Sequence, residues 1–200
     1  EIEKIILKFL KDYCLKNNLL LGVSTRVRPD DLLGKEKYTN ILGDKNWIYF
    51  PRRKPNVYGD YEAYGKVMLS EYIVSIDSTL GYEAISRKKK VVFFPLGAFS
   101  PEWCRENYVT DEKKSYFYIP SKFGYPLNFE REGEFWLSDF NEKKIEEKLN
   151  FILNINHEEW KNLLDQIGLK KIINFDLHNK ILLNNLKNLG VPLQKDKLMR

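Results

Sequence analysis

Residues that could hold a phosphate group stand together in the stretch SIDSTLGYEAISRKKKVVFFP, residues 75–95. Ser78 and Thr79 follow an apolar run and open a helical pattern, so they occupy the first positions of a predicted helix. Such positions offer unpaired backbone N–H groups, hydroxyl donors and the positive end of the helix dipole, which together favour an anion. We therefore predict that Ser78, Thr79 and the backbone around Gly81 form a cradle for a phosphate or a diphosphate.

Gly81 and Glu83 extend this predicted site along the helix. Gly81 removes a side chain from the first turn, so a ligand or a neighbouring strand can come close. Glu83 lies one turn into the helix and suits the hydroxyls of a ribose or a sugar, because a carboxylate only accepts hydrogen bonds. From the residue types alone, Asp77, Ser78 and Thr79 are also ordinary capping residues, and the stretch is neither a P-loop nor a G-x-G-x-x-G motif.

Four arginines follow the first two predicted strands. Arg26 and Arg28 come after the first strand, and Arg52 and Arg53 after the second. In open parallel sheets, ligands bind outside the carboxyl ends of the strands, and arginine grips phosphate through two parallel hydrogen bonds. Arg26 and Arg28 are therefore candidate phosphate ligands, and Arg52 and Arg53 are additional candidates. Solvated loop positions are the alternative for all four.

Two further residues are weaker candidates. Tyr64 could stack on a base, although packing on the sheet explains it more simply. Asp77 could act as a general base, but its place at a strand end favours a role in capping or in fixing the loop.

The elements that position these residues alternate between helices and short apolar strands in the first half of the chain. The predicted strands are residues 19–24, 47–51, 72–77 and 91–96, and the predicted helices are residues 2–16, 30–43, 61–69 and 78–89. This alternation predicts an α/β fold with a parallel sheet and helices on both faces.

The second half has a different pattern. Residues 98–133 are aromatic, charged and irregular, and residues 134–138 (EFWLS) are predicted to form a last edge strand. Three helices are predicted to follow within residues 140–156, 157–173 and 176–190, with Asn141 as the N-cap of the first.

The composition limits the class of protein. The chain has 200 residues, enough for one domain. Its formal charge of +5 suits an anionic partner, and a lysine-rich composition from A·T-biased coding is the alternative explanation. The charges are mixed along the sequence, which argues against a nucleic-acid-binding stripe. Cys14 and Cys104 fit neither a metal site nor a disulfide framework, and no signal peptide or run of about 20 apolar residues is visible. We therefore expect a cytoplasmic protein without a metal ion.

The stretch VSIDSTLGYEAISRKKKVVFF resembles the signature of bacterial surface-carbohydrate biosynthesis proteins. Its usual form is a strand, Asp-Ser-Thr-Leu-Gly-Tyr-Glu, a helix, Arg-Gly-Lys and a second strand. These proteins resemble the carboxyl-terminal, donor-binding half of glycosyltransferases of the GT-B fold. The similarity is tight over residues 73–94, looser over residues 7–72, and after Phe99 it rests on the final helices with EEW. Lys88 stands where the pattern has glycine, and at a helix end we expect it to be tolerated.

The resemblance implies a nucleotide-sugar site in a glycosyltransferase that makes a capsule or a lipopolysaccharide. Ser78, Thr79, Gly81 and the first two arginines would meet the donor phosphates, and Glu83 the ribose or the sugar. The implied domains are a Rossmann-like nucleotide-sugar-binding domain (1–140), C-terminal helices packed on the same domain (141–192) and a tail (193–200).

The resemblance also implies the partners of the chain. These are a nucleotide sugar and a glycan or glycolipid acceptor, with peripheral association at the inner face of the membrane and no cofactor. The catalytic base is expected on an N-terminal acceptor domain that this chain lacks. A sugar-nucleotide epimerase and a non-catalytic nucleotide- or polyanion-binding module are the alternatives. The base, the sugar, the acceptor and the stereochemical outcome are left open.

Overall fold

The computed structural model describes residues 2–24, 32–50, 60–76, 78–95, 123, 130–138, 141–173, 175–176 and 180–190. Within these ranges the protein is an α/β structure with parallel strands and seven α-helices. This finding confirms the predicted α/β class, but the strands are short and form two small sheets. None of the helices in these ranges combines the length and the apolar character that crossing a bilayer requires.

Helices and strands alternate in the first half as the apolar pattern predicts. The elements are α1 (Ile2–Lys16), β1 (Leu21–Ser24), α2 (Leu32–Leu42), β2 (Trp47–Phe50), α3 (Asp60–Leu69), β3 (Tyr72–Ser75), α4 (Thr79–Ser86) and β4 (Lys90–Phe93). Helix α1 forms because its apolar residues recur at helical spacing, and Ile6, Leu10 and Tyr13 are buried on one side of it.

The strands belong to two hydrogen-bonded sheets. Strands β1 and β2 pair in parallel, from Leu21 beside Trp47 to Ser24 beside Phe50. The larger sheet also contains β5 (Glu132–Gly133) and β6 (Trp136–Leu137), and it has the order β3-β4-β6-β5. Strands β3 and β4 are parallel. Leu21 packs against the apolar cores of both sheets, so β1 lies next to the larger sheet.

Strands β5 and β6 form a hairpin shortly before helix α6 (Glu142–Asn154). Strand β6 pairs in parallel with β4 through Phe93 and Trp136, and antiparallel with β5. A strand does lie within the predicted residues 134–138, but it is shorter than predicted. Its predicted edge position is wrong, because β5 covers its outer side. Gly133 makes this possible, because a Cβ there would lie 2.1 Å from the Trp136 ring.

Side chains of the following helix hold the hairpin. Lys144 Nζ and Lys148 Nζ lie 2.5 and 3.0 Å from the carboxylate oxygens of Glu132. Their hydrogen bonds lower the pKa of Glu132 below its ordinary value. Within the hairpin segment, Trp136 Nε1 donates to the backbone carbonyl of Glu130 at 2.9 Å.

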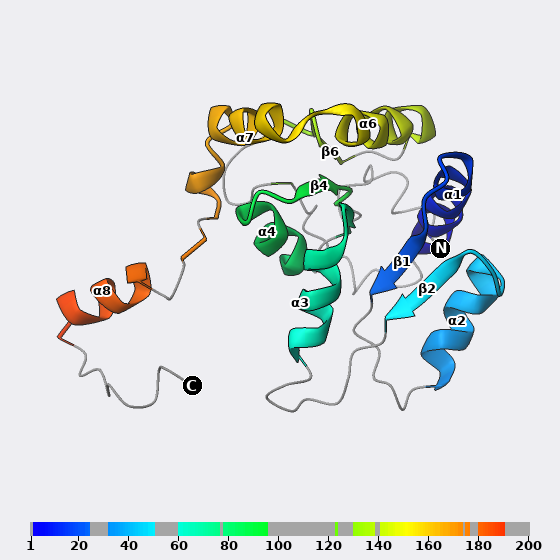
Figure 1. Ribbon diagram of the computed structural model, residues 1–200, viewed down its shortest axis with the longest axis horizontal. Coiled ribbons are helices and arrows are strands. Elements are labelled where there is room, and N and C mark those ends of the chain that lie inside the picture. Colours follow the sequence, from blue (N-terminus) through cyan, green and yellow to red (C-terminus); the bar gives the residue numbers. More distant parts are fainter. Residues whose placement is uncertain are drawn as a thin grey trace, which may run out of the picture.

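The C-terminal part contains α6 (Glu142–Asn154), α7 (His157–Gln166), a short 3-10 helix (Leu169–Lys171) and α8 (Lys180–Asn188). Asn141 is the N-cap of α6, as predicted, since its side chain accepts from the Lys144 N–H. Asn156 caps α7 in a capping box with Glu159. Helix α8 has no buried residue and lies apart from the other elements in Figure 1.

Helices cover both faces of the larger sheet. Figure 1 shows α6 and α7 on one side of β4 and β6, and α3 and α4 on the other. Phe135 packs against Trp160 of α7, with ring centroids 4.9 Å apart. On the opposite face, Tyr82 of α4 packs against Phe93, with centroids 4.8 Å apart. The core therefore holds α4 against the sheet, and the predicted phosphate cradle lies at the amino-terminal end of this helix.

Candidate functional site

The junction between β3 and α4 is fixed by buried polar contacts. Ser75 ends β3 and is only 3% exposed. Its hydroxyl donates to the carbonyl of Ser78 at 3.3 Å, and its own carbonyl accepts from the Phe94 N–H at 2.9 Å. Ser78 is in an extended conformation and forms the N-cap of α4. The chain thus leaves the carboxyl end of a parallel strand and turns at once into a helix.

The first turn of α4 uses part of its own hydrogen-bonding capacity. Ser78 Oγ accepts from the Leu80 N–H at 3.3 Å, and the Gly81 N–H donates to the Ser78 carbonyl at 3.0 Å. The capping interpretation of Ser78 is therefore correct. The Thr79 N–H makes no backbone or side-chain hydrogen bond to the part of the chain that the structure describes.

Gly81 faces the sheet. A Cβ built on it would lie 2.2 Å from Ser75 Oγ and 3.1 Å from Phe93 Cε1. Gly81 was expected to allow the close approach of either a ligand or a neighbouring strand. In the direction in which a side chain would point, the structure shows the neighbouring strands. Its N–H is already occupied within the turn, so a ligand would have to replace that bond to reach it.

Thr79 and Glu83 lie on the outer side of α4. Thr79 is exposed and Glu83 is half-buried, whereas Gly81, Ala84 and Ile85 are buried against the sheet. Residues four apart are neighbours on a helix surface, so the two outer side chains stand one above the other. The Glu83 carboxylate has no hydrogen-bond or ion-pair partner within the described ranges. The structure therefore brings Ser78, Thr79 and Glu83 together.

Five of the other predicted site residues lie outside the described residues: Asp77, Arg26, Arg28, Arg52 and Arg53. Tyr64 lies in α3, but its side chain is not among those described.

Sequence reasoning did not single out Ser138. This residue follows β6 directly, is 2% exposed, and its Oγ has no hydrogen-bond partner within the described part of the chain. The one signal in the sequence is a serine directly after the apolar residues of FWL, a pattern that by itself indicates a turn.

The backbone at the carboxyl-terminal end of α4 explains why the surface-carbohydrate signature has glycine at the position of Lys88. Lys88 has a φ of +65°, in the left-handed region that glycine adopts without steric cost. Its N–H donates to the Ile85 carbonyl, and the Lys89 N–H donates to the Ala84 carbonyl. These two bonds form a Schellman motif, in which the left-handed position is the one that lysine occupies here.

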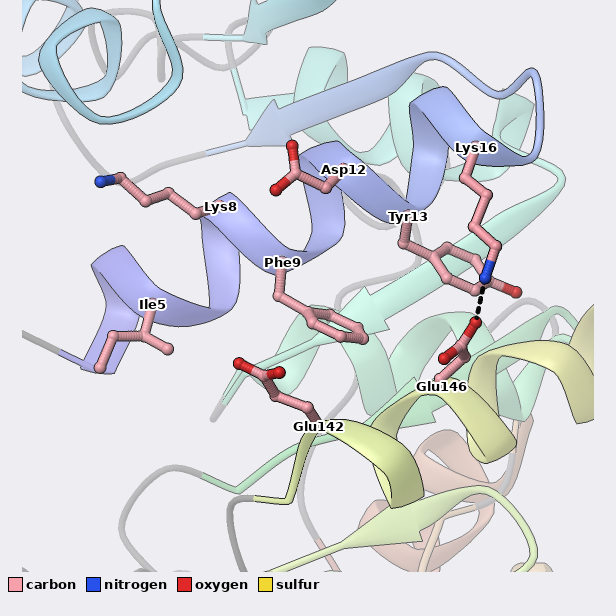
Figure 2. A pocket seen from close by; sticks show the side chains of 8 residues that line it. All are labelled: Ile5, Lys8, Phe9, Asp12, Tyr13, Lys16, Glu142 and Glu146. Carbon is pink, nitrogen blue, oxygen red and sulfur yellow. Dashed lines mark hydrogen bonds and ion pairs between the residues drawn. The ribbon is translucent and has the colours of Figure 1, made fainter.

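A surface hollow of about 420 Å³ lies between α1 and α6 (Figure 2). Ile5 and Phe9 line its apolar part, and Lys16 forms an ion pair with Glu146 at its rim at 2.8 Å. Burial and the nearby Glu146 raise the pKa of Tyr13, also in the lining, to about 12. The hollow contains none of the predicted site residues. No group of three His, Cys, Asp or Glu side chains in the described ranges is arranged to bind a metal ion.

A family model described as "putative O-antigen biosynthesis protein" matches residues 1–190. No curated protein sequence and no solved structure matches the chain.

Proposed function

The chain belongs to this family of O-antigen biosynthesis proteins, and from that membership we propose that it binds a nucleotide sugar as the donor-binding half of a GT-B glycosyltransferase. The membership confirms the predicted link to surface-carbohydrate biosynthesis. One observation carries the finer proposal: Ser78, Thr79 and Glu83 stand together where a parallel strand ends and a helix begins.

The donor phosphates bind the amino-terminal end of α4 in this proposal. The Thr79 N–H and hydroxyl are available to an anion, since neither donates to a described residue. The cap bond from Leu80 to Ser78 Oγ, at 3.3 Å, is longer than the usual 2.7–3.2 Å range, so a phosphate oxygen can replace it at little cost. The helix dipole adds up to about 2 kcal/mol for a partly buried anion.

Glu83 binds a hydroxyl of the ribose or of the sugar. It stands one turn from Thr79 on the same side of α4, close to a phosphate held at the helix end. An ionised carboxylate offers only acceptors, which suits the O–H donors of a sugar.

The strand order supports a site at this position. Strand β3 pairs on only one side within the described sheet, and Leu21 of β1 contacts both cores. Placing β1 beside β3 gives the order β2-β1-β3-β4-β6. This order matches a common doubly wound arrangement, in which the connections reverse between the first and third strands. Ligands of such sheets bind at that reversal point, where α4 begins.

The proposed reaction is the transfer of the sugar to a glycan or glycolipid acceptor. The acceptor hydroxyl attacks the anomeric carbon, the new glycosidic bond forms as the bond to phosphate breaks, and the nucleotide phosphate leaves with the electron pair. The helix end stabilises the charge that develops on the leaving phosphate, which is an established use of aligned N–H donors. The proposal requires no metal ion or cofactor, and it assigns the proton-accepting base to a separate acceptor half.

Calorimetric titration with UDP, GDP, CMP and their sugar conjugates tests the proposal. Wild-type protein should bind at least one of them. Replacing both Ser78 and Thr79 by alanine should weaken that binding about 10- to 100-fold for each hydroxyl contact that is lost, because charge-assisted hydrogen bonds contribute about 1.5–3 kcal/mol each. The matched control is Asn141→Ala, which removes the corresponding cap bond of α6 and should leave binding unchanged.

The outcomes separate the alternative functions. A folded wild-type protein that binds none of these nucleotides would refute the proposal. Binding of any polyphosphate with equal affinity would indicate a polyanion-binding module. Conversion of a bound sugar nucleotide to its epimer, followed by NMR, would indicate an epimerase.

A further inference from the structure

Ser138 carries a buried hydroxyl that no described residue of the chain contacts through a hydrogen bond. Its Oγ has no hydrogen-bond partner within the described residues, although the residue is 2% exposed. Its backbone is satisfied, because its N–H donates to the Arg131 carbonyl at 2.8 Å. A buried hydroxyl without a partner is destabilising, and almost all such groups in native proteins have one. Within the described part of the chain, this hydroxyl is therefore left for another partner, such as a water molecule or a ligand.

A row of three aligned residues places Ser138 relative to α4. Ser75 pairs with Phe93, and Phe93 pairs with Trp136, so the three lie side by side on parallel strands. Side chains in such a row share one face of the sheet. Helix α4 covers this face: Gly81 lies against Ser75 and Phe93.

Aromatic rings continue this face from α4 to β6. Phe123 stacks on Tyr82 of α4 and on Trp136 of β6, with centroids 5.8 and 4.7 Å apart. The rings of Phe123 and Trp136 are also buried, at 1% and 5% exposed. They offer no open platform on which a nucleobase could stack.

Ser138 lies on this same face and at the same edge as the start of α4. It is two residues beyond Trp136, and its N–H bond to Arg131 continues the ladder of β6, so the strand alternation applies to it. Ser78 is three residues beyond Ser75 in the same direction. Neighbouring strands are about 4.8 Å apart, which puts β3 and β6 about 10 Å apart.

We propose that the Ser138 hydroxyl binds a hydroxyl of the sugar portion of the donor, while the phosphates occupy the start of α4. This inference rests on the proposed function and deepens it. A serine hydroxyl both donates and accepts, as sugar hydroxyls do. The sugar is joined directly to the phosphate, so it is the part of the donor that extends from α4 across β4 towards β6. The burial of the Phe123 and Trp136 rings on this face favours the sugar over the base.

Ser138→Ala tests the proposal with paired ligands. The affinities of UDP-N-acetylglucosamine and UDP, and of GDP-mannose and GDP, are measured by calorimetry for the pair that wild-type protein binds. The variant should bind the sugar nucleotide about 10-fold more weakly and the bare nucleotide within twofold of wild type. Without ligand it should be at least as stable as wild type in urea, because the change removes an unpaired polar group.

Ser70→Ala is the matched control. Ser70 lies before β3, at the opposite edge of the sheet, and its hydroxyl donates to the Lys66 carbonyl. This variant should keep both affinities.

The other possible results of the Ser138→Ala measurements separate the inference from the proposed function. Unchanged sugar-nucleotide affinity in Ser138→Ala would overturn the inference while leaving the proposed function intact. An equal loss for the bare nucleotide would overturn the assignment to the sugar. A variant that is unfolded, or less stable than Ser70→Ala, would show that the hydroxyl has a partner within the chain. Failure of wild type to bind UDP, GDP, CMP or any of their sugar conjugates would reject both proposals.

Discussion

Glycine at position 88 is expected to give a more stable protein than alanine at the same position, even though glycine usually weakens a helix. Lys88 has a φ of +65° at the carboxyl end of α4. For a residue with a Cβ, the left-handed conformation costs about 1–2 kcal/mol. Glycine avoids that cost but loses about 0.5–1 kcal/mol through the greater freedom of the unfolded chain. The difference favours glycine by about 0.5–1 kcal/mol.

The side chain of Lys88 must be separated from its backbone. Its Nζ lies 3.4 Å from Asp165 Oδ1 in a partly exposed ion pair, which contributes about 0–1 kcal/mol. Lys88→Ala removes the same ion pair but keeps the Cβ. Comparing Lys88→Gly with Lys88→Ala therefore isolates the backbone conformation.

Urea denaturation of the two variants provides the assay. Lys88→Gly should have a free energy of unfolding about 0.5–1 kcal/mol above that of Lys88→Ala, and a melting temperature higher by about 1–4 °C. The control pair is Glu147→Gly and Glu147→Ala, at an exposed position in the middle of α6, where alanine should be better by about 1 kcal/mol. If glycine is also the less stable residue at position 88, the reasoning from the left-handed conformation is refuted.

Two further predictions concern the core and the response to pH. Gly81→Ala should destabilise the protein by about 1–3 kcal/mol because its Cβ would meet Ser75 Oγ at 2.2 Å. In a double-mutant cycle, Ser75→Gly should recover part of that loss, whereas additive effects of the two changes on the free energy of unfolding would argue against the contact. The pKa of Tyr13 is raised to about 12, so its contribution to stability is complete below pH 10 and is lost as the pH rises towards 12. Tyr13→Phe should therefore reduce the loss of stability between pH 10 and 12, as measured by urea denaturation at each pH, and an unchanged slope would contradict the assignment.

The sequence was sufficient to predict elements whose signal is local. The helix at residues 2–16 has its apolar residues at helical spacing, and Asn141 caps α6 as its type suggests. The capping role of Ser78 was also predictable, whereas the cradle for phosphate stays a prediction. Each of these features depends on neighbours within a few residues.

Features that depend on pairing across the chain could not be predicted. The edge position assigned to residues 134–138 was wrong because β5 pairs on the outer side of β6, and no local pattern indicates that pairing. The contact between Gly81 and Ser75 requires the packing of α4 on β3. The burial of Ser138 depends on distant parts of the chain that pack over it, which the local sequence does not reveal. Its residue type alone indicated a turn.

The hairpin that ends the larger sheet also has a consequence for self-association. The outermost strand of the described sheet, β5, is two residues long and carries the charged Glu132. Long, flat, apolar strands at such a border can recruit a second chain and lead to aggregates, and short charged strands prevent this. Because Lys144 and Lys148 hold Glu132 in place, this border offers little backbone for another molecule to join.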